Sequence, residues 1–327
     1  MFDKGAEIII RELNKIGYEG YIVGGAVRDY LMGRAINDYD ITTNAKPDVI
    51  MSLPFKNFPS GLSHGTVTVV IDDKNYEVTT YRIETDYYDH RHPSKVEFSS
   101  ILRDDLKRRD FTINALAYDI NTNKVIDCFS GIKDIDNKLI RCVGNPYERF
   151  EEDALRILRS LRFAATLDFS IEELTSKAIN EKYRDIKYIS RERVNVELSK
   201  LIVGNNAPFI LKEYAFIFNF IIPEISMEKF VFLANNIEDS SNDLIIRLSI
   251  LLSSVKDVVC VMKSLRYPNI TTIIVNNFIE CYKKSFQSKQ EIYEIIKQIR
   301  LENMPKFLSY LKAMKYSNDK FTEIIEL

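Results

Sequence analysis

The sequence predicts an α+β protein, in which a mixed, largely antiparallel sheet with helices is followed by an all-helical remainder. Over the first 130 residues, short β-branched segments alternate with segments of helical periodicity. From about residue 147 onward the periodicity is helical, and four prolines separate the segments: Pro208, Pro223, Pro268 and Pro305. With 327 residues the chain is too long for one compact core, so two or more domains are expected.

The elements expected in the N-terminal part are strand 21–23, a tight turn at Gly24-Gly25, a helix from Ala26 to about Met32, strands 65–71, 76–82 and 96–98, helix 106–118 and strand 124–129. The polar stretch 72–75 between two of these strands is typical of a β-hairpin. The helices expected later are 150–166, 171–183, 191–203, 209–222, 230–237 and 243–253. We expect three domains, at residues 1–135, 136–204 and 205–327.

Composition limits the class of protein. The 45 basic and 47 acidic residues nearly balance, so any nucleic-acid contact must come from local patterning rather than from overall charge. The four cysteines form no C-x-x-C pair, which favours small buried side chains in a reducing compartment. The N-terminal segment is an amphipathic helix without the apolar run of a signal peptide, and no stretch is long enough to span a membrane. A cytoplasmic protein without a membrane partner is expected.

A Gly-Gly turn between the first strand and helix is a candidate phosphate site. Glycines at Gly24 and Gly25 let backbone N–H groups approach an anion, and the start of the helix adds partial positive charge. Arg28, one turn into the helix, would place a guanidinium beside the same phosphates. Alone, a Gly-Gly pair is usually an ordinary turn.

Two carboxylates follow within about twenty residues, at Asp38 and Asp40. The segment 37–41 has strand character, and side chains two apart in a strand share a face. Hard oxygen ligands in this arrangement suit Mg²⁺, which activates a hydroxyl and stabilises a leaving pyrophosphate. A lone D-x-D is more often the exposed edge of a strand or loop. Glu77 would be a third carboxylate on a neighbouring strand, but an exposed strand position fits it equally well.

Together and in this order, these motifs resemble the signature of the nucleotidyltransferase superfamily. The wording GGAVRD followed by D-x-D is similar to the branch that contains tRNA nucleotidyltransferases and bacterial poly(A) polymerases. The resemblance implies a nucleotidyltransferase palm followed by a helical neck, body and tail. It also implies that Gly25 and Arg28 bind the triphosphate of a nucleotide.

A second motif places Asp153, Arg156, Arg159 and Arg162 three residues apart on one expected helix, where successive members are neighbours. In an unselected helix, a solvated face with ion pairs would be the usual interpretation. A carboxylate can instead accept from an exocyclic amino group while a guanidinium donates to the ring, which favours C and A over U and G. The segment resembles the E-D-x-x-R element by which class II tRNA nucleotidyltransferases choose the base. Arg159 and Arg162 would hold the triphosphate or brace the pair.

The segment RRDFTINA at residues 108–115 is either a basic helix start or a nucleotide-binding element. It resembles the family element that grips ribose and phosphates. That resemblance implies that Arg109 contacts the phosphate or sugar, that Asp110 accepts from the ribose 2′-hydroxyl, and that Asn114 supports this contact. The loop at Asp89–Pro93 is either an ordinary loop or, by its D-x-R-x-P pattern, similar to the flexible loop of enzymes that add the complete CCA.

These resemblances identify the chain as a member of the class II tRNA nucleotidyltransferases. They imply attack of a tRNA 3′-hydroxyl on the α-phosphate of CTP or ATP, adding C, C and A without a nucleic-acid template and using Mg²⁺. The first domain would be the catalytic head, the second the base-reading neck and the third an RNA-binding body and tail. A poly(A) polymerase, a partial CC- or A-adding enzyme, and an inactive RNA-binding relative are the alternatives. Three histidines are too few for a fused phosphohydrolase domain in this chain.

Overall fold

A computed structural model describes residues 2–87, 93–284 and 288–316 of the chain. The chain separates into two compact units. The first comprises residues 1–156 together with 170–188, and the second comprises residues 157–169 together with 189–327. The three-domain division at residues 135 and 204 stays a prediction.

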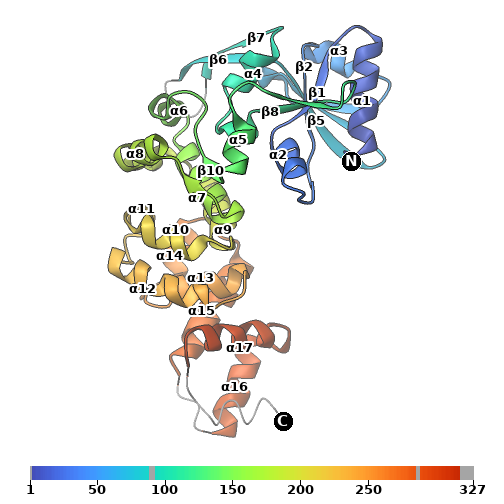
Figure 1. Cartoon of the computed structure of the whole chain (residues 1–327). Coiled ribbons are helices and arrows are strands. Elements are labelled where there is room, and N and C mark those ends of the chain that lie inside the picture. Colours follow the sequence, from blue (N-terminus) through green and yellow to red (C-terminus); the bar gives the residue numbers. More distant parts are fainter. Residues whose placement is uncertain (1, 88–92, 285–287, 317–327) are drawn as a thin grey trace. The chain divides into compact units, whose positions relative to one another are not determined.

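The first unit is built on a seven-stranded sheet with the order β3-β4-β5-β2-β1-β8-β9 (Figure 1). Its strands are β1 Gly20–Val23, β2 Asp40–Thr43, β3 Lys56–Gly61, β4 Thr66–Ile71, β5 Lys74–Thr80, β8 Leu116–Asp119 and β9 Lys124–Asp127. Only the β2–β5 pair is parallel, and every other pair in this sheet is antiparallel. The expected mixed, largely antiparallel sheet is therefore confirmed, as is the hairpin formed by β4 and β5.

The core of this sheet is covered by an amphipathic helix, α1 Lys4–Lys15. Its residues Ile9, Ile10 and Leu13 are fully buried and belong to one cluster with the inward side chains of the sheet. Apolar residues at i, i+1 and i+4 of a helix form the stripe that packs on a sheet face. Because α1 packs on a face of the sheet, it does not cover the end of β1 or the start of β2, where polar groups lie.

The remaining elements of the first unit are α2 Gly25–Leu31, α3 Pro47–Met51, the two-stranded sheet of β6 Arg82–Tyr87 and β7 Pro93–Phe98, α4 Leu102–Lys107, α5 Gly131–Asp136, β10 Leu139–Ile140, α6 Pro146–Glu152, β11 Ser170–Ile171 and α8 Glu173–Lys182. The predicted helix 26–32, strand 96–98 and helix 171–183 are confirmed within the usual uncertainty of element ends.

The helix predicted at residues 106–118 is wrong. The chain there forms the end of α4, a single 3-10 turn at Thr112–Asn114 and strand β8. β8 pairs with β1 on one side and with β9 on the other. These ladder hydrogen bonds, formed with residues distant in sequence, override the local helical pattern of the segment.

The second unit is helical. It contains most of α7 Leu155–Leu167, followed by α9 Arg191–Ile202, α10 Ala207–Glu213, α11 Ala215–Ile221, α12 Met227–Glu238, α13 Leu244–Leu252, α14 Val258–Ser264, α15 Asn269–Tyr282, α16 Lys289–Ile299 and α17 Met304–Ala313 (Figure 1). The predicted helix 209–222 is two helices that meet at Tyr214. Among the described residues, no helix combines the length and apolar composition needed to cross a membrane.

Candidate active site

The Gly-Gly turn lies where β1 passes into α2. Gly24 has φ 72°, a left-handed conformation that favours glycine, and its N–H donates to the Leu116 carbonyl of β8 at 3.2 Å. A Cβ atom on Gly24 would lie 3.0 Å from an Nη1 atom of Arg109 and 3.6 Å from an Oδ2 atom of Asp40. The turn therefore brings a bare backbone, a guanidinium and a carboxylate together.

Asp40 is the first residue of β2, and Asp38 precedes the strand. The expectation that both belong to one strand is wrong, because the ladder with β1 begins at Asp40, opposite Val23. Both side chains are exposed. Desolvation by the surrounding protein raises the pKa of Asp40, the positive charge of Arg109 opposes this rise, and the negative charge of Asp38 adds to it.

Glu77 lies directly beside this pair. In the parallel β2–β5 ladder its Cα is the partner of the Asp40 Cα. Desolvation raises the pKa of Glu77, and the charges of Asp40 and Asp38 raise it further. Within the described ranges, no three His, Cys, Asp or Glu side chains are gathered closely enough to hold a metal ion by themselves. The three carboxylates nonetheless form a patch of negative potential that a cation would stabilise.

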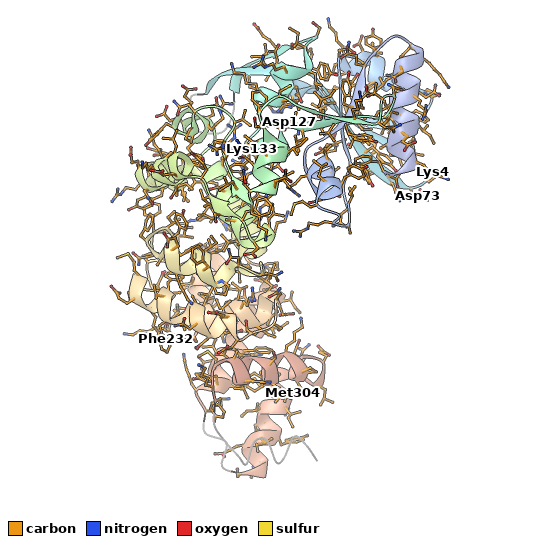
Figure 2. All side chains as sticks on the ribbon, in the orientation of Figure 1. Lys4, Asp73, Asp127, Lys133, Phe232 and Met304 are labelled. Carbon is orange, nitrogen blue, oxygen red and sulfur yellow. The ribbon has the colours of Figure 1, made fainter. Side chains whose placement is uncertain are left out.

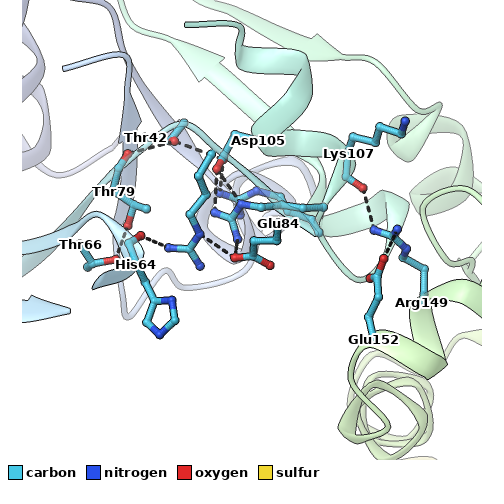
Figure 3. Close-up of polar contacts among 12 residues, drawn as sticks. Thr42, His64, Thr66, Thr79, Glu84, Asp105, Lys107, Arg149 and Glu152 are labelled. Atoms are coloured by element: carbon cyan, nitrogen blue, oxygen red, sulfur yellow. Dashed lines mark hydrogen bonds and ion pairs between the residues drawn. The ribbon is translucent and has the colours of Figure 1, made fainter. Parts of the chain in front are cut away.

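Arg109 is held by a buried acid. Asp105, which is fully buried on α4, accepts from Arg109 Nη2 at 3.2 Å and from two nitrogens of Arg108 at 2.9 and 2.6 Å (Figure 3). Burial alone would raise the pKa of Asp105, but the charges of Arg108 and Arg109 outweigh it and hold that pKa below its usual value. Asp105 also accepts from the Thr42 hydroxyl of β2 at 3.2 Å, so the network is tied to the strand that starts with Asp40.

Arg28 and Asp110 are joined through an amide. Arg28 Nη1 donates to Asn114 Oδ1 at 2.7 Å, and Asn114 Nδ2 donates to Asp110 Oδ1 at 3.2 Å. The same Asp110 oxygen accepts from the Phe111 N–H at 2.8 Å, and Arg28 also contacts the carboxylate of Asp29. The structure thus brings three predicted residues into one buried chain of hydrogen bonds, and the predicted contact with a ribose hydroxyl stays a prediction.

Asp153 and Arg156 are not on one continuous helix, which corrects the interpretation of residues 150–166. α6 ends at Glu152, Asp153 is extended, and α7 starts at Leu155. The carboxylate of Asp153 accepts from the Leu155 N–H at 3.0 Å, as an N-cap does. An acidic residue that satisfies an unpaired N–H at the start of a helix also favours a break there, which periodicity alone does not reveal.

The guanidinium of Arg156 is nearly buried and held in place. It donates to Glu152 Oε2 at 2.5 Å, to the Arg149 carbonyl at 3.2 Å and to the Arg108 carbonyl at 3.0 Å. Arg149 donates in turn to the Lys107 carbonyl and to Glu152 (Figure 3). Since Arg108 adjoins Arg109, the Asp153–Arg156 segment is fastened to the same stretch of chain as the Arg109 guanidinium.

Arg159 and Arg162 belong to the second unit, where both pair with Glu197 of α9, at 3.8 and 2.5 Å. The Arg162 guanidinium also lies 3.7 Å from the ring centroid of Phe163. These contacts brace α7 against α9. A contact of either arginine with a nucleotide stays a prediction.

Two family models and several curated relatives match parts of this chain. The model of the poly(A) polymerase head domain matches residues 20–141, and the model of a probable RNA- and SrmB-binding site of polymerase A matches residues 168–228. A CCA-adding enzyme of Enterococcus faecalis is 51% identical over 215 residues, which are 64% of this chain and 53% of the relative. One of Staphylococcus epidermidis is 52% identical over 201 residues, or 62% of this chain and 50% of the relative. The chain is thus similar to the poly(A) polymerase head domain over residues 20–141 and to CCA-adding enzymes over about two thirds of its length.

The fold agrees with that of a solved CCA-adding enzyme. The Bacillus stearothermophilus CCA-adding enzyme in complex with CTP matches with a TM-score of 0.81 and 28% identity, over 99% of this chain and 81% of that chain. The chain spans about half the length of the curated CCA-adding enzymes that it matches. Members of the nucleotidyltransferase family generally use a divalent metal ion.

Two contributors to the candidate site were missed from the sequence: Asp105 orients Arg109, and Glu152 holds Arg156. Within the predicted Gly-Gly turn, Gly24 rather than Gly25 makes the closest approach to Arg109 and Asp40. Both acids are four residues before the arginine that they hold, a spacing at which helical side chains meet, and that signal was available. The motif at Asp89–His92 lies outside the described residues, and Pro93 starts β7.

Proposed function

We propose that this protein adds C, C and A to the 3′ end of tRNA from CTP and ATP, without a nucleic-acid template. The observation that carries the proposal is the meeting of Asp40, Arg109 and the Gly24 turn, with the Asp153–Arg156 segment fastened to the residue next to Arg109. The curated relatives that match about two thirds of this chain are named CCA-adding enzymes, and the Bacillus stearothermophilus enzyme was solved with CTP.

Asp38 and Asp40 are the proposed ligands of Mg²⁺. Mg²⁺ is commonly held by one or two carboxylates together with substrate phosphates, and the two exposed aspartates at the turn supply that donor set. The fit is supported by the mutual repulsion of the neighbouring carboxylates, which a cation relieves. Bound there, the ion would lower the pKa of the attacking hydroxyl and neutralise charge on the leaving pyrophosphate.

Arg109 and Arg28 are the proposed partners of the triphosphate. Arg109 is oriented by Asp105 beside the Gly24 backbone, and a Cβ on Gly25 would lie 3.5 Å from an Arg28 nitrogen. Two guanidiniums flanking a backbone without side chains suit the oxygens of a phosphate chain. Asp110, fixed by Asn114 and the Phe111 N–H, would accept a hydrogen bond from the ribose 2′-hydroxyl.

Asp153 and Arg156 are the proposed readers of the base. A carboxylate accepts from the exocyclic amino group that cytosine and adenine share, and a guanidinium donates to an adjacent ring acceptor. Uracil and guanine would place a carbonyl oxygen against the carboxylate. The three acceptors around Arg156 fix the orientation of its guanidinium before a nucleotide binds, which lowers the ordering cost of recognition.

The proposal is tested by supplying CTP and ATP, separately and together, to three RNAs: tRNA without its CCA end, tRNA ending in CC, and an unrelated RNA of equal length. Sequencing of the 3′ ends should reveal C and C added from CTP alone, A added only after CC, and no addition to the unrelated RNA. Long A-tracts would instead identify a poly(A) polymerase. Absence of any incorporation would indicate an inactive RNA-binding relative.

A further inference from the structure

An aromatic cluster lies behind the segment that carries the two aspartates. Phe2 is only 6% exposed, and its ring centroid lies 4.6 Å from Tyr30, 4.5 Å from Tyr118 and 6.4 Å from Tyr39. Tyr39 in turn lies 6.4 Å from Tyr76. These separations fall in the range in which tilted and edge-to-face aromatic pairs attract one another.

Two members of the cluster are the sequence neighbours of the carboxylates. Tyr39 stands between Asp38 and Asp40, and Tyr76 precedes Glu77, the ladder partner of Asp40. Successive side chains of a strand point to opposite faces, so Tyr76 lies on the face away from Glu77. Tyr39 and Tyr76 both contact the apolar core on that face. The aromatic side chains therefore anchor the backbone that carries the carboxylates to the apolar core.

A second attachment fixes the same place. Asp3 caps α1 by accepting from the Gly5 N–H at 2.8 Å, and it accepts from Lys74 Nζ at 2.8 Å and from the Tyr76 hydroxyl. A Cβ on Gly5 would lie 2.2 Å from that hydroxyl oxygen, so the approach of α1 to Tyr76 requires glycine. The start of α1, and Phe2 with it, is thereby tied to β5 next to Glu77.

The segment before β2 needs such support. Residues 34–39 have no helical or strand hydrogen-bond ladder, so backbone pairing holds Asp40 but not Asp38. The spacing of two like-charged carboxylates must then be set by side-chain packing, and Tyr39 is the side chain between them. Mg²⁺ requires near-octahedral geometry with ligands at about 2.0–2.1 Å, which makes that spacing critical.

We propose that Phe2 is a positioning residue for the metal site: by packing against Tyr39 it holds Asp38 and Asp40 at the separation that a divalent cation requires. This inference rests on the proposed role of the two aspartates as metal ligands. It assigns Phe2 no contact with substrate. Loss of the ring should weaken cation binding and leave metal-free CTP binding unchanged.

The test measures Mn²⁺ binding to the full chain by electron paramagnetic resonance of the free ion, in wild type, Phe2→Ala, Phe2→Tyr and Leu53→Ala. Leu53 has the same 6% exposure in the same core cluster and no aromatic ring, so Leu53→Ala is a control for a loss of packing in that core. Phe2→Tyr keeps the ring, and a cavity of about 500 Å³ lined by Phe2, Glu7 and Arg11 has room for its hydroxyl.

Phe2→Ala should bind Mn²⁺ about tenfold more weakly than wild type, the size expected for a residue coupled to a site through packing. The Mn²⁺ affinities of Phe2→Tyr and Leu53→Ala should stay within about twofold of wild type. The temperature of thermal unfolding should fall by a similar amount in Phe2→Ala and Leu53→Ala. Wild-type affinity in Phe2→Ala, or equal weakening in Leu53→Ala, overturns the positioning role. Absence of Mn²⁺ binding in wild type overturns the proposed metal ligands, and the positioning role with them.

Discussion

Arg109 and Arg156 are each held by an acidic side chain that has no proposed contact with substrate. Asp105 accepts from Arg109, and Glu152 accepts from Arg156. A long side chain loses rotamer entropy when it is ordered, and a fixed partner moves that cost from substrate binding to folding. The residue types at the site follow from the sequence motifs, whereas the partners that orient them depend on which segments the fold brings together.

Asp40→Asn should lower the rate of nucleotide addition by about 10³-fold, since removal of a charged metal ligand costs several kcal/mol of transition-state stabilisation. The size of the side chain is preserved, so CTP binding in the absence of metal should be retained. Steady-state incorporation into tRNA ending in CC, with Mg²⁺ varied, measures the effect. A chelator should abolish the wild-type activity as well.

Asp73→Asn is the matched control for that change. Asp73 lies in the exposed turn between β4 and β5, with φ 59°, a conformation that asparagine tolerates (Figure 2). The control should retain wild-type activity. If Asp40→Asn is as active as Asp73→Asn, Asp40 is not a metal ligand.

At the scale of elements, the sequence predicted the β4–β5 hairpin, α2, α8 and the helical second unit, because local hydrophobic period and turn residues determine them. It failed where distant segments decide the structure. β8 forms a strand because β1 and β9 flank it, and the break between α6 and α7 depends on the Asp153 carboxylate turning to the Leu155 N–H. In both places a helix competes with another conformation, and the sequence of the segment alone does not reveal which of the two is more stable.

The end of α9 depends on a buried arginine from α13. Arg247 is 3% exposed and donates to the carbonyls of Ile202 and Gly204, both at 2.7 Å. Burial lowers the pKa of its guanidinium, but the several carbonyl acceptors stabilise the charged form. Arg247 thus satisfies the carbonyls that a helix C-terminus leaves unpaired.

Arg247→Met should lower the free energy of unfolding of the second unit by about 3 kcal/mol, because two buried carbonyls lose a charged donor. Urea unfolding followed by circular dichroism measures the change. Lys212→Met on α10, which removes an exposed ion pair with Glu238, should change stability by less than about 0.5 kcal/mol. Equal midpoints for the two variants would show that Arg247 does not secure the end of α9.

At the scale of the whole molecule, the charge balance is near neutral but uneven along the chain. Nine Lys and Arg face six Asp and Glu over residues 283–327, a region without a quotable sequence motif. Excess positive charge on an RNA-binding surface releases counterions from phosphates, which makes affinity depend on salt. The C-terminal region is the proposed source of this contribution to tRNA binding.

Raising the salt concentration from 50 to 200 mM should therefore weaken tRNA binding by about 40-fold, the effect of about three phosphate contacts. Lys297→Glu, at an exposed position of α16, should reduce the logarithmic salt slope by about one. Lys4→Glu, at an exposed position of α1, makes the same charge change in the first unit and should leave the slope unchanged (Figure 2). Filter binding of labelled tRNA over a salt series measures the slope of each variant. Equal slopes for Lys297→Glu and Lys4→Glu would exclude Lys297 from the RNA-binding surface.

In the proposed function, side chains of the protein choose C and A, and Asp153→Asn removes the carboxylate on which that choice depends. Asparagine caps a helix as well as aspartate, so α7 should keep its start and the protein its stability. One carboxylate oxygen, however, becomes an amino donor that accommodates the carbonyl of uracil. We predict that discrimination between CTP and UTP, measured by competitive incorporation into tRNA lacking CCA, falls by about 10- to 100-fold, the value of one specific base contact. Wild-type discrimination in Asp153→Asn would show that Asp153 does not read the base.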